Sequence, residues 1–83
     1  MTVKGRVAQA LLSLKNKFGL NEEGCIDIRL SRQDLASYAG TTYEPVFRIM
    51  NELSEENIIQ VSGKNIMVLN DEKLESFTKD DGL

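Results

Sequence analysis

The chain has 83 residues, a hydrophobic content of 41% and a formal net charge of −3, from 10 basic and 13 acidic residues. This length predicts one small domain, and the apolar content is that of a folded chain. Because no apolar run approaches the roughly 20 residues needed to cross a bilayer, and because Lys4 and Arg6 interrupt the start, we expect no membrane span, no signal peptide and a cytoplasmic location.

The sequence offers little for catalysis or metal binding. It contains one cysteine, Cys25, and no histidine. Zinc sites draw on several Cys and His residues, and a reactive thiol needs a nearby base or cation. The motifs of phosphate-binding loops and of nucleophile elbows are also missing. We therefore expect no enzyme, no metal and no cofactor in this chain, and we expect Cys25 to be a small buried apolar residue.

The first thirty residues predict a helix followed by a strand. Apolar side chains recur at helical spacing over residues 3–18, and Gly19 ends this segment. Residues 25–30 alternate apolar and charged side chains, which predicts a half-buried strand. The apolar positions of the helix are Val7, Leu11, Leu14 and Phe18.

Residues 31–51 predict two helices joined by a sharp turn. Ser31 can cap the first helix, with Asp34 three residues later as its partner. Gly40 ends this helix, since glycine tolerates the positive φ of such a turn. Thr42 is placed to cap the second helix. Helix pairs of this kind typically insert their second helix into the major groove of DNA, so sequence-specific DNA binding is the leading hypothesis.

The remaining segments predict a hairpin and a last short helix. The second helix of the pair is expected over about residues 42–57, with Val46, Ile49, Met50 and Leu53 facing inward. Two apolar runs, 58–61 and 65–69, flank a turn that contains Gly63. Residues 70–77 can form a short helix, and residues 79–83 are expected to fray. The order predicts one α+β domain over residues 1–83, a winged helix-turn-helix with a three-helix core, a β-hairpin wing and one extra short strand.

Four segments carry specific patterns. Residues 5–9, GRVAQ, fit G-R-[IV]-A-x, and residues 30–36, LSRQDLA, fit [IL]-[ST]-R-[QE]-[DE]-[IL]-[AG]. Residues 40–48, GTTYEPVFR, line up with G-x-[ST]-x-E-[TS]-[VI]-x-R, and Gly63-Lys64 falls in the hairpin turn. The combination covers nearly the whole chain and resembles the C-terminal DNA-binding domain of Crp/Fnr-type bacterial transcription regulators, the cyclic-AMP receptor protein family.

By that resemblance, Glu44 and Arg48 are the base-reading pair. A carboxylate can accept a hydrogen bond from cytosine N4, and a guanidinium can donate two bonds to guanine O6 and N7. Their spacing of four residues places both on one face of a helix. The simpler alternative is a surface ion pair worth a few tenths of a kcal/mol. The resemblance also implies phosphate contacts, or else capping and solvated side chains, for Ser31, Arg32, Gln33, Thr42 and Lys64.

Three positions depart from the family pattern. Tyr43 stands where members of the cyclic-AMP receptor type place an arginine, and a tyrosine cannot make a bidentate contact. Pro45 replaces a Thr or Ser and removes a hydroxyl. Phe47 is expected to point outward, where it meets a thymine methyl group or covers an apolar surface. Tyr43 and Phe47 therefore join the base-reading candidates, and the expected target differs from that of the cyclic-AMP receptor protein.

The resemblance also implies partners and a larger context. The expected partner is double-stranded DNA with a palindromic site, bound by a homodimer, and RNA polymerase is a further candidate. Family members carry an N-terminal effector-binding domain and a long dimerisation helix, so the chain is expected to be a fragment of a longer protein. Cyclic nucleotide, haem and iron–sulfur sensors all occur in this family, and the sequence assigns no effector.

A winged helix can also be a protein–protein interaction module without DNA binding, and the acidic balance leaves this alternative open. The charge of the surface around the second helix of the pair distinguishes DNA binding from protein binding. A positive surface that joins Arg32, Arg48 and Lys64 to the lysines of residues 4–17 would favour DNA. A negative surface would favour a protein partner, and it would come from Glu44, Glu52, Glu55 and Glu56.

Overall fold

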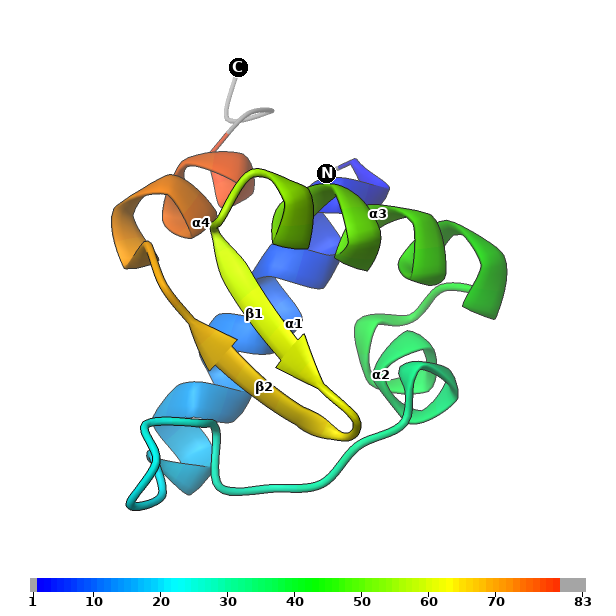
Figure 1. The fold of residues 1–83 in the computed structure, drawn as a ribbon. Coiled ribbons are helices and arrows are strands. Elements are labelled where there is room, and N and C mark those ends of the chain that lie inside the picture. Colours follow the sequence, from blue (N-terminus) through cyan, green and yellow to red (C-terminus); the bar gives the residue numbers. More distant parts are fainter. Residues whose placement is uncertain (1, 80–83) are drawn as a thin grey trace.

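A computed structural model describes residues 2–79 of the chain. In this part, the order of elements is α1 (Val3–Phe18), α2 (Arg32–Ala39), α3 (Tyr43–Glu55), β1 (Ile59–Ser62), β2 (Asn65–Val68) and α4 (Asp71–Thr78). Figure 1 shows the hairpin in front of α1, with α2 and α3 on one side and α4 on the other. The predicted α+β winged helix-turn-helix is confirmed. The expectation of fraying for residues 80–83 lies outside the described residues.

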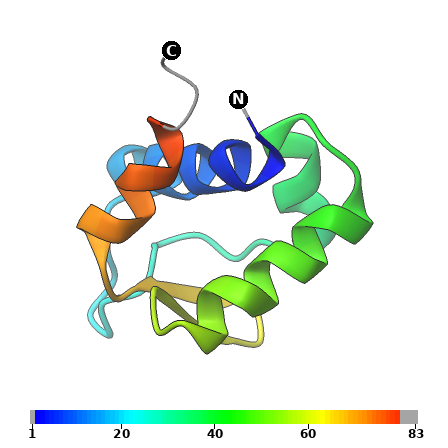
Figure 2. The ribbon, with the colours of Figure 1, turned by 90° about the horizontal axis from the view of Figure 1, so that it is seen from above.

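Helix α1 packs against each of the other three helices. Figure 2 shows it along one side of the molecule, with α3 and the hairpin on the other. The apolar side chains predicted to face inward from α1 are buried, except that of Phe18, which is 40% exposed. Phe18 is the last residue of α1, and Lys17 Nζ lies 5.7 Å from the centroid of its ring. The core side chains that are fully buried include Val7, Leu11, Leu35, Val46, Met50, Leu53, Ile59 and Leu74.

The strand predicted over residues 25–30 is wrong as an element. Only Ile26 pairs, in an isolated bridge with Leu20, and its N–H also donates to the carbonyl of Ile66 at 2.8 Å. Ile28 and Leu30 are partly buried against the core, which accounts for the alternating pattern. The chain bends after Ile26, where the N–H of Ile28 donates to the carbonyl of Ile26 at 2.7 Å, so the segment is an irregular connection from α1 to α2. The expected extra short strand is therefore reduced to one bridge.

The wing is a short antiparallel hairpin. Ile59 pairs with Val68 and Ser62 with Asn65, which leaves Gly63 and Lys64 as the turn. Gly63 has a φ of 62°, a conformation that favours glycine. Hydrogen bonds from Leu69 and Asn70 to the carbonyl of Ile58 join the end of the hairpin to the start of α4. The predicted hairpin and last helix are both confirmed.

Two further predictions can be compared with residues 2–79. Cys25 is a free thiol with 8% of its surface exposed, so it is buried as expected. Within these residues, no helix combines the length and the apolar character that crossing a membrane requires.

Candidate nucleic-acid interface

The turn between α2 and α3 sets the angle of the helix pair. Gly40 has a φ of 76° and a ψ of 34°, and its N–H donates to carbonyls of the last turn of α2. Its own carbonyl accepts a hydrogen bond from the Arg6 guanidinium at 3.3 Å. This contact ties the turn to the first helix, because Arg6 lies on α1. The turn at Gly40 is therefore held by a hydrogen bond from α1 as well as by its own backbone hydrogen bonds.

The two helices of the pair begin differently. At α2, the Ser31 hydroxyl accepts from the N–H of Asp34 at 3.1 Å, and the Asp34 carboxylate accepts from the N–H of Ser31 at 3.3 Å. This is the reciprocal capping box that the sequence predicts. At α3, Thr42 occupies the cap position, but its side chain makes no capping hydrogen bond. The prediction that the Thr42 hydroxyl caps α3 is wrong, and this exposed hydroxyl remains available to a ligand.

Helix α3 presents a polar face opposite its buried one. Val46, Ile49, Met50 and Leu53 are buried as predicted. Glu44 and Arg48 are both exposed. Among residues 2–79, neither takes part in an ion pair, so the simpler alternative of a surface ion pair is not realised. A free carboxylate and a free guanidinium one helical turn apart can each accept or donate hydrogen bonds to an external partner.

Aromatic side chains flank this polar face. The rings of Tyr43 and Phe47 stack with centroids 5.9 Å apart and an angle of 25° between their planes. Both are exposed, at 45% and 41%, and the outward position predicted for Phe47 is confirmed. The guanidinium carbon of Arg32 lies 5.1 Å from the centroid of the Phe47 ring. A side chain from the start of α2 thus reaches the flank of α3.

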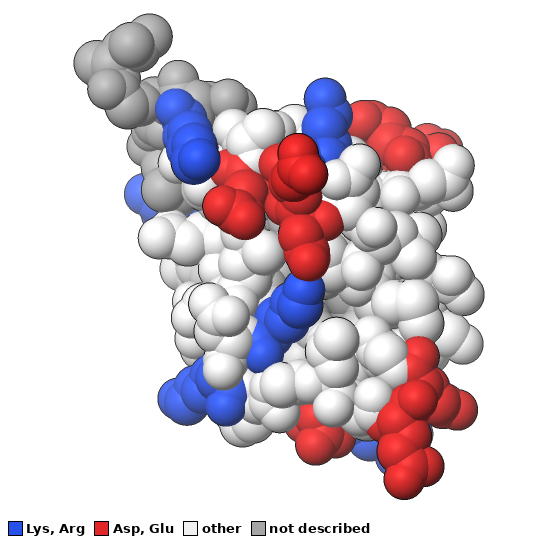
Figure 3. Space-filling model, turned by 90° about the vertical axis from the view of Figure 1, so that its left-hand side faces the viewer, with Lys and Arg blue, Asp and Glu red and all other residues white. Residues whose placement is uncertain are grey.

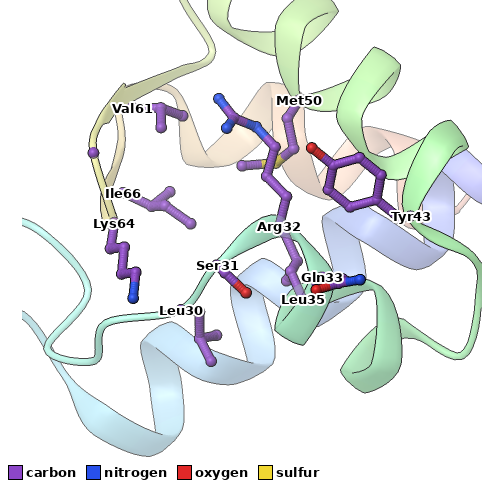
Figure 4. Close-up of a pocket in the computed structure, with 11 residues that line it drawn as sticks. Leu30, Ser31, Arg32, Gln33, Leu35, Tyr43, Met50, Val61, Lys64 and Ile66 are labelled. Carbon is purple, nitrogen blue, oxygen red and sulfur yellow. The ribbon is translucent and has the colours of Figure 1, made fainter.

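A groove separates α3 from the wing, and several predicted site residues line it (Figure 4). Its volume is about 450 Å³. The floor is apolar, and two cationic side chains, Arg32 and Lys64, belong to its lining. The polar and aromatic lining includes Ser31, Gln33 and Tyr43, whereas the floor includes Leu30, Leu35, Met50, Val61 and Ile66. The phosphate-contact candidates other than Thr42 therefore share one groove, next to the helix face that carries Glu44 and Arg48.

Two of the three lysines of α1, Lys4 and Lys15, are paired with carboxylates. Lys4 Nζ lies 3.5 Å from Glu52 Oε1 and 4.0 Å from Glu56 Oε2. Lys15 Nζ lies 2.6 Å from Asp71 Oδ2. Figure 3, which shows the side of the molecule at the left of Figure 1, has both signs interspersed. The cations beside α3 are thus Arg48 on the helix and Arg32 and Lys64 in the groove, and two of the four carboxylates named above, Glu52 and Glu56, lie beside Lys4.

Asn51 was not among the residues predicted for the site. It is exposed and lies three residues beyond Arg48 and seven beyond Glu44, which places it on the same helix face. An asparagine amide can make two hydrogen bonds to adenine, so its chemistry suits this face. The spacing from Glu44 was the signal in the sequence that could have found it. The described residues contain no cluster of three or more His, Cys, Asp or Glu side chains able to hold a metal ion.

Comparisons with known proteins decide the family. Residues 5–77 match the model of the Crp-like helix-turn-helix domain. The chain belongs to this family. It is 34% identical over 76 residues to a probable transcriptional regulator, flp, of Lacticaseibacillus casei, a match that covers 92% of this chain and 33% of the relative. It is 35% identical over 69 residues to the cAMP-activated global transcriptional regulator CRP of Salmonella typhimurium, a match that covers 82% of this chain and 33% of that relative.

Solved structures of family members agree with this assignment. The catabolite activator protein of Thermus thermophilus superposes with a TM-score of 0.78 at 30% identity, over 92% of this chain and 33% of that one. A CRP/FNR-family transcriptional regulator from the same organism gives 0.84 at 27% identity, over 96% and 42%. The chain spans about a third of the length of the curated relatives it matches. The two curated relatives are named as transcriptional regulators, and the part of each that matches this chain corresponds to the Crp-like helix-turn-helix domain.

Proposed function

We propose that this Crp-like domain binds DNA sequence-specifically, with α3 in the major groove and Arg48 and Glu44 reading bases. The observation that carries the proposal is the exposed, unpaired Glu44 and Arg48 on the outer face of the second helix of the pair. A guanidinium recognises guanine through O6 and N7, and a carboxylate recognises cytosine through N4. A G·C pair, or two adjacent ones, is therefore the expected core of each half-site.

The residues around this pair position the domain on the backbone. Ser31, Gln33 and Lys64 line the groove beside α3, and the Thr42 hydroxyl is free at the start of α3. Hydroxyl, amide and ammonium groups of this kind bind phosphate oxygens. Tyr43 and Phe47 add an aromatic flank suited to a thymine methyl group. The sequence also places Arg32 among the phosphate contacts, but its position over Phe47 favours a different role.

The larger context follows from the family. The domain acts within a longer protein that binds a palindromic site as a homodimer in the bacterial cytoplasm, with RNA polymerase as a further partner. A dimer places two α3 helices one turn of DNA apart, and this linkage raises the effective concentration of the second domain. The domain contributes DNA recognition and no catalysis, and the effector belongs to another part of the protein.

Selection of bound sequences from random duplexes tests this proposal. The parent chain and Arg48→Ala are compared at about 50 mM salt, where weak binding of a single domain is strengthened. The parent should enrich a G·C-containing motif, and Arg48→Ala should lose the preference at one position. Glu55→Gln, an exposed change in the last turn of α3, is the matched control and should keep the parent motif. No enrichment by the parent, or an unchanged motif with Arg48→Ala, would refute the proposal.

A further inference from the structure

We infer that Arg32 reads a guanine in the major groove and that Phe47 is the positioning residue that holds its guanidinium there. This inference rests on the proposed function, since it assumes that α3 enters the groove. It assigns to Arg32 a contact with a base in place of a contact with phosphate, and it gives Phe47 a role that does not require Phe47 itself to recognise a base.

The first step is the contact between the two side chains. The guanidinium carbon of Arg32 lies 5.1 Å from the centroid of the Phe47 ring, within the range of a cation–π contact. Phe47 is itself stacked on Tyr43. An arginine held against an aromatic ring is already restricted to few rotamers before any ligand binds. It therefore loses less conformational entropy when it forms hydrogen bonds to that ligand.

The second step is the direction of the Arg32 side chain. In Figure 4 it runs from the start of α2 toward Met50 on α3, whereas Lys64 remains on the wing. Phe47 lies on α3 immediately before Arg48. If α3 enters the major groove, the Phe47 ring and the guanidinium that rests on it enter with it. A phosphate contact would instead need this side chain to leave the ring and extend outward.

The third step concerns the N–H donors of the Arg32 guanidinium and which of them can bind a base. The Nε of Arg32 is buried and has no hydrogen-bond partner among the described residues. Because this atom is buried, an external acceptor does not reach it, and the proposed contact is made by the two terminal nitrogens of the guanidinium, which are not buried unpartnered atoms. The two acceptors on the major-groove edge of guanine match the fork of N–H donors at the edge of a guanidinium. The terminal edge of the guanidinium, beside the Phe47 ring, therefore supplies the donors of the proposed contact.

The test compares selected motifs and salt dependence for four variants of the chain. Arg32→Ala and Phe47→Leu should both lose a guanine at the same position, which differs from the position that depends on Arg48. Discrimination there should fall by between about fivefold and about a hundredfold, as expected for one bidentate contact. Arg32→Lys should fail to restore it, because lysine has no planar fork. Gln33→Ala, the neighbouring groove residue, should weaken binding evenly and keep the motif.

The outcomes separate this inference from the proposed function. A parent chain that enriches no motif overturns both. A parent motif that Arg32→Ala leaves unchanged, with the slope of log K against log salt reduced by about one, makes Arg32 a phosphate contact and overturns the inference alone. The same holds if Phe47→Leu leaves the motif unchanged. An upfield ring-current shift of the Arg32 side-chain resonances, lost in Phe47→Leu, should accompany the predicted result; its absence in the parent would contradict the stacking.

Discussion

Ser31 and Asp34 each satisfy the other's backbone N–H at the start of α2, whereas Thr42 at the start of α3 leaves its hydroxyl unused. Both helices thus have a hydroxyl residue at the N-cap, but only the hydroxyl of Ser31 makes a capping hydrogen bond. The first is held by its own cap. The second leaves the Thr42 hydroxyl without a capping bond, as the proposed phosphate contact requires, and two substitutions test this difference.

Ser31→Ala should destabilise the fold. The substitution leaves the N–H of Asp34 without its acceptor, and loss of such a cap lowers the free energy of unfolding by about 1 kcal/mol. Urea unfolding followed by circular dichroism measures this change. Ser37→Ala, at an exposed serine of the same helix, should stay within about 0.5 kcal/mol of the parent. Equal losses for both variants would mean that the cap contributes nothing specific.

Thr42→Ala should leave the stability of the fold nearly unchanged and weaken DNA binding. Because its hydroxyl makes no capping bond, the free energy of unfolding should change by no more than about 0.5 kcal/mol. Affinity for DNA should fall by a similar factor for every duplex, since phosphate contacts carry no sequence information. Fluorescence anisotropy with a selected and an unrelated duplex measures both. Undiminished affinity would remove Thr42 from the interface.

Gly40→Ala should destabilise the helix pair through the backbone alone. A Cβ at this position would approach only Arg6 Nη1, at 4.0 Å, so no steric clash arises. The φ of 76° nevertheless disfavours an L-residue by roughly 1–2 kcal/mol. Gly40→Asn is the control and should lose less, because asparagine tolerates this conformation. If thermal unfolding gives the same loss for both variants, backbone strain is not its cause.

Tyr43→Arg should change the selected motif at one position of each half-site. Tyr43 is exposed at the start of α3, next to Glu44, and an arginine there could make the bidentate guanine contact that a tyrosine cannot. Selection from random duplexes compares the motifs, with Tyr43→Phe as a variant that keeps the aromatic pair. An identical motif for Tyr43→Arg and the parent would show that this side chain does not face the bases.

Local chemistry made much of the fold predictable. The Ser31–Asp34 cap, the turn glycine Gly40 and the inward stripe of α3 each depend on residues within a few positions of one another, and all three are confirmed. The strand over residues 25–30 was wrong because alternation predicts burial of alternate side chains, which an irregular connection also provides here. Whether a strand forms depends on a neighbour, and beyond Ile26 there is none.

The candidate site was predictable as a set of residues and not as an arrangement. Glu44 and Arg48 could be placed on one helix face from their spacing alone. The stacking of Arg32 on Phe47 joins residues on different helices, and the groove also needs the wing, so neither has a signal in the local sequence. The pairing of Lys4 with Glu52 is another contact of this kind, and it moves a lysine away from the surface expected to bind DNA.

In the proposed complex, α3 is the element that contacts DNA. Amide chemical shifts of the labelled chain, followed during titration with a selected duplex, test it directly. The largest changes should fall on the first two turns of α3, the start of α2 and the turn at Gly63 and Lys64. Changes confined to α1 and α4, or an unchanged spectrum at saturating duplex, would contradict it.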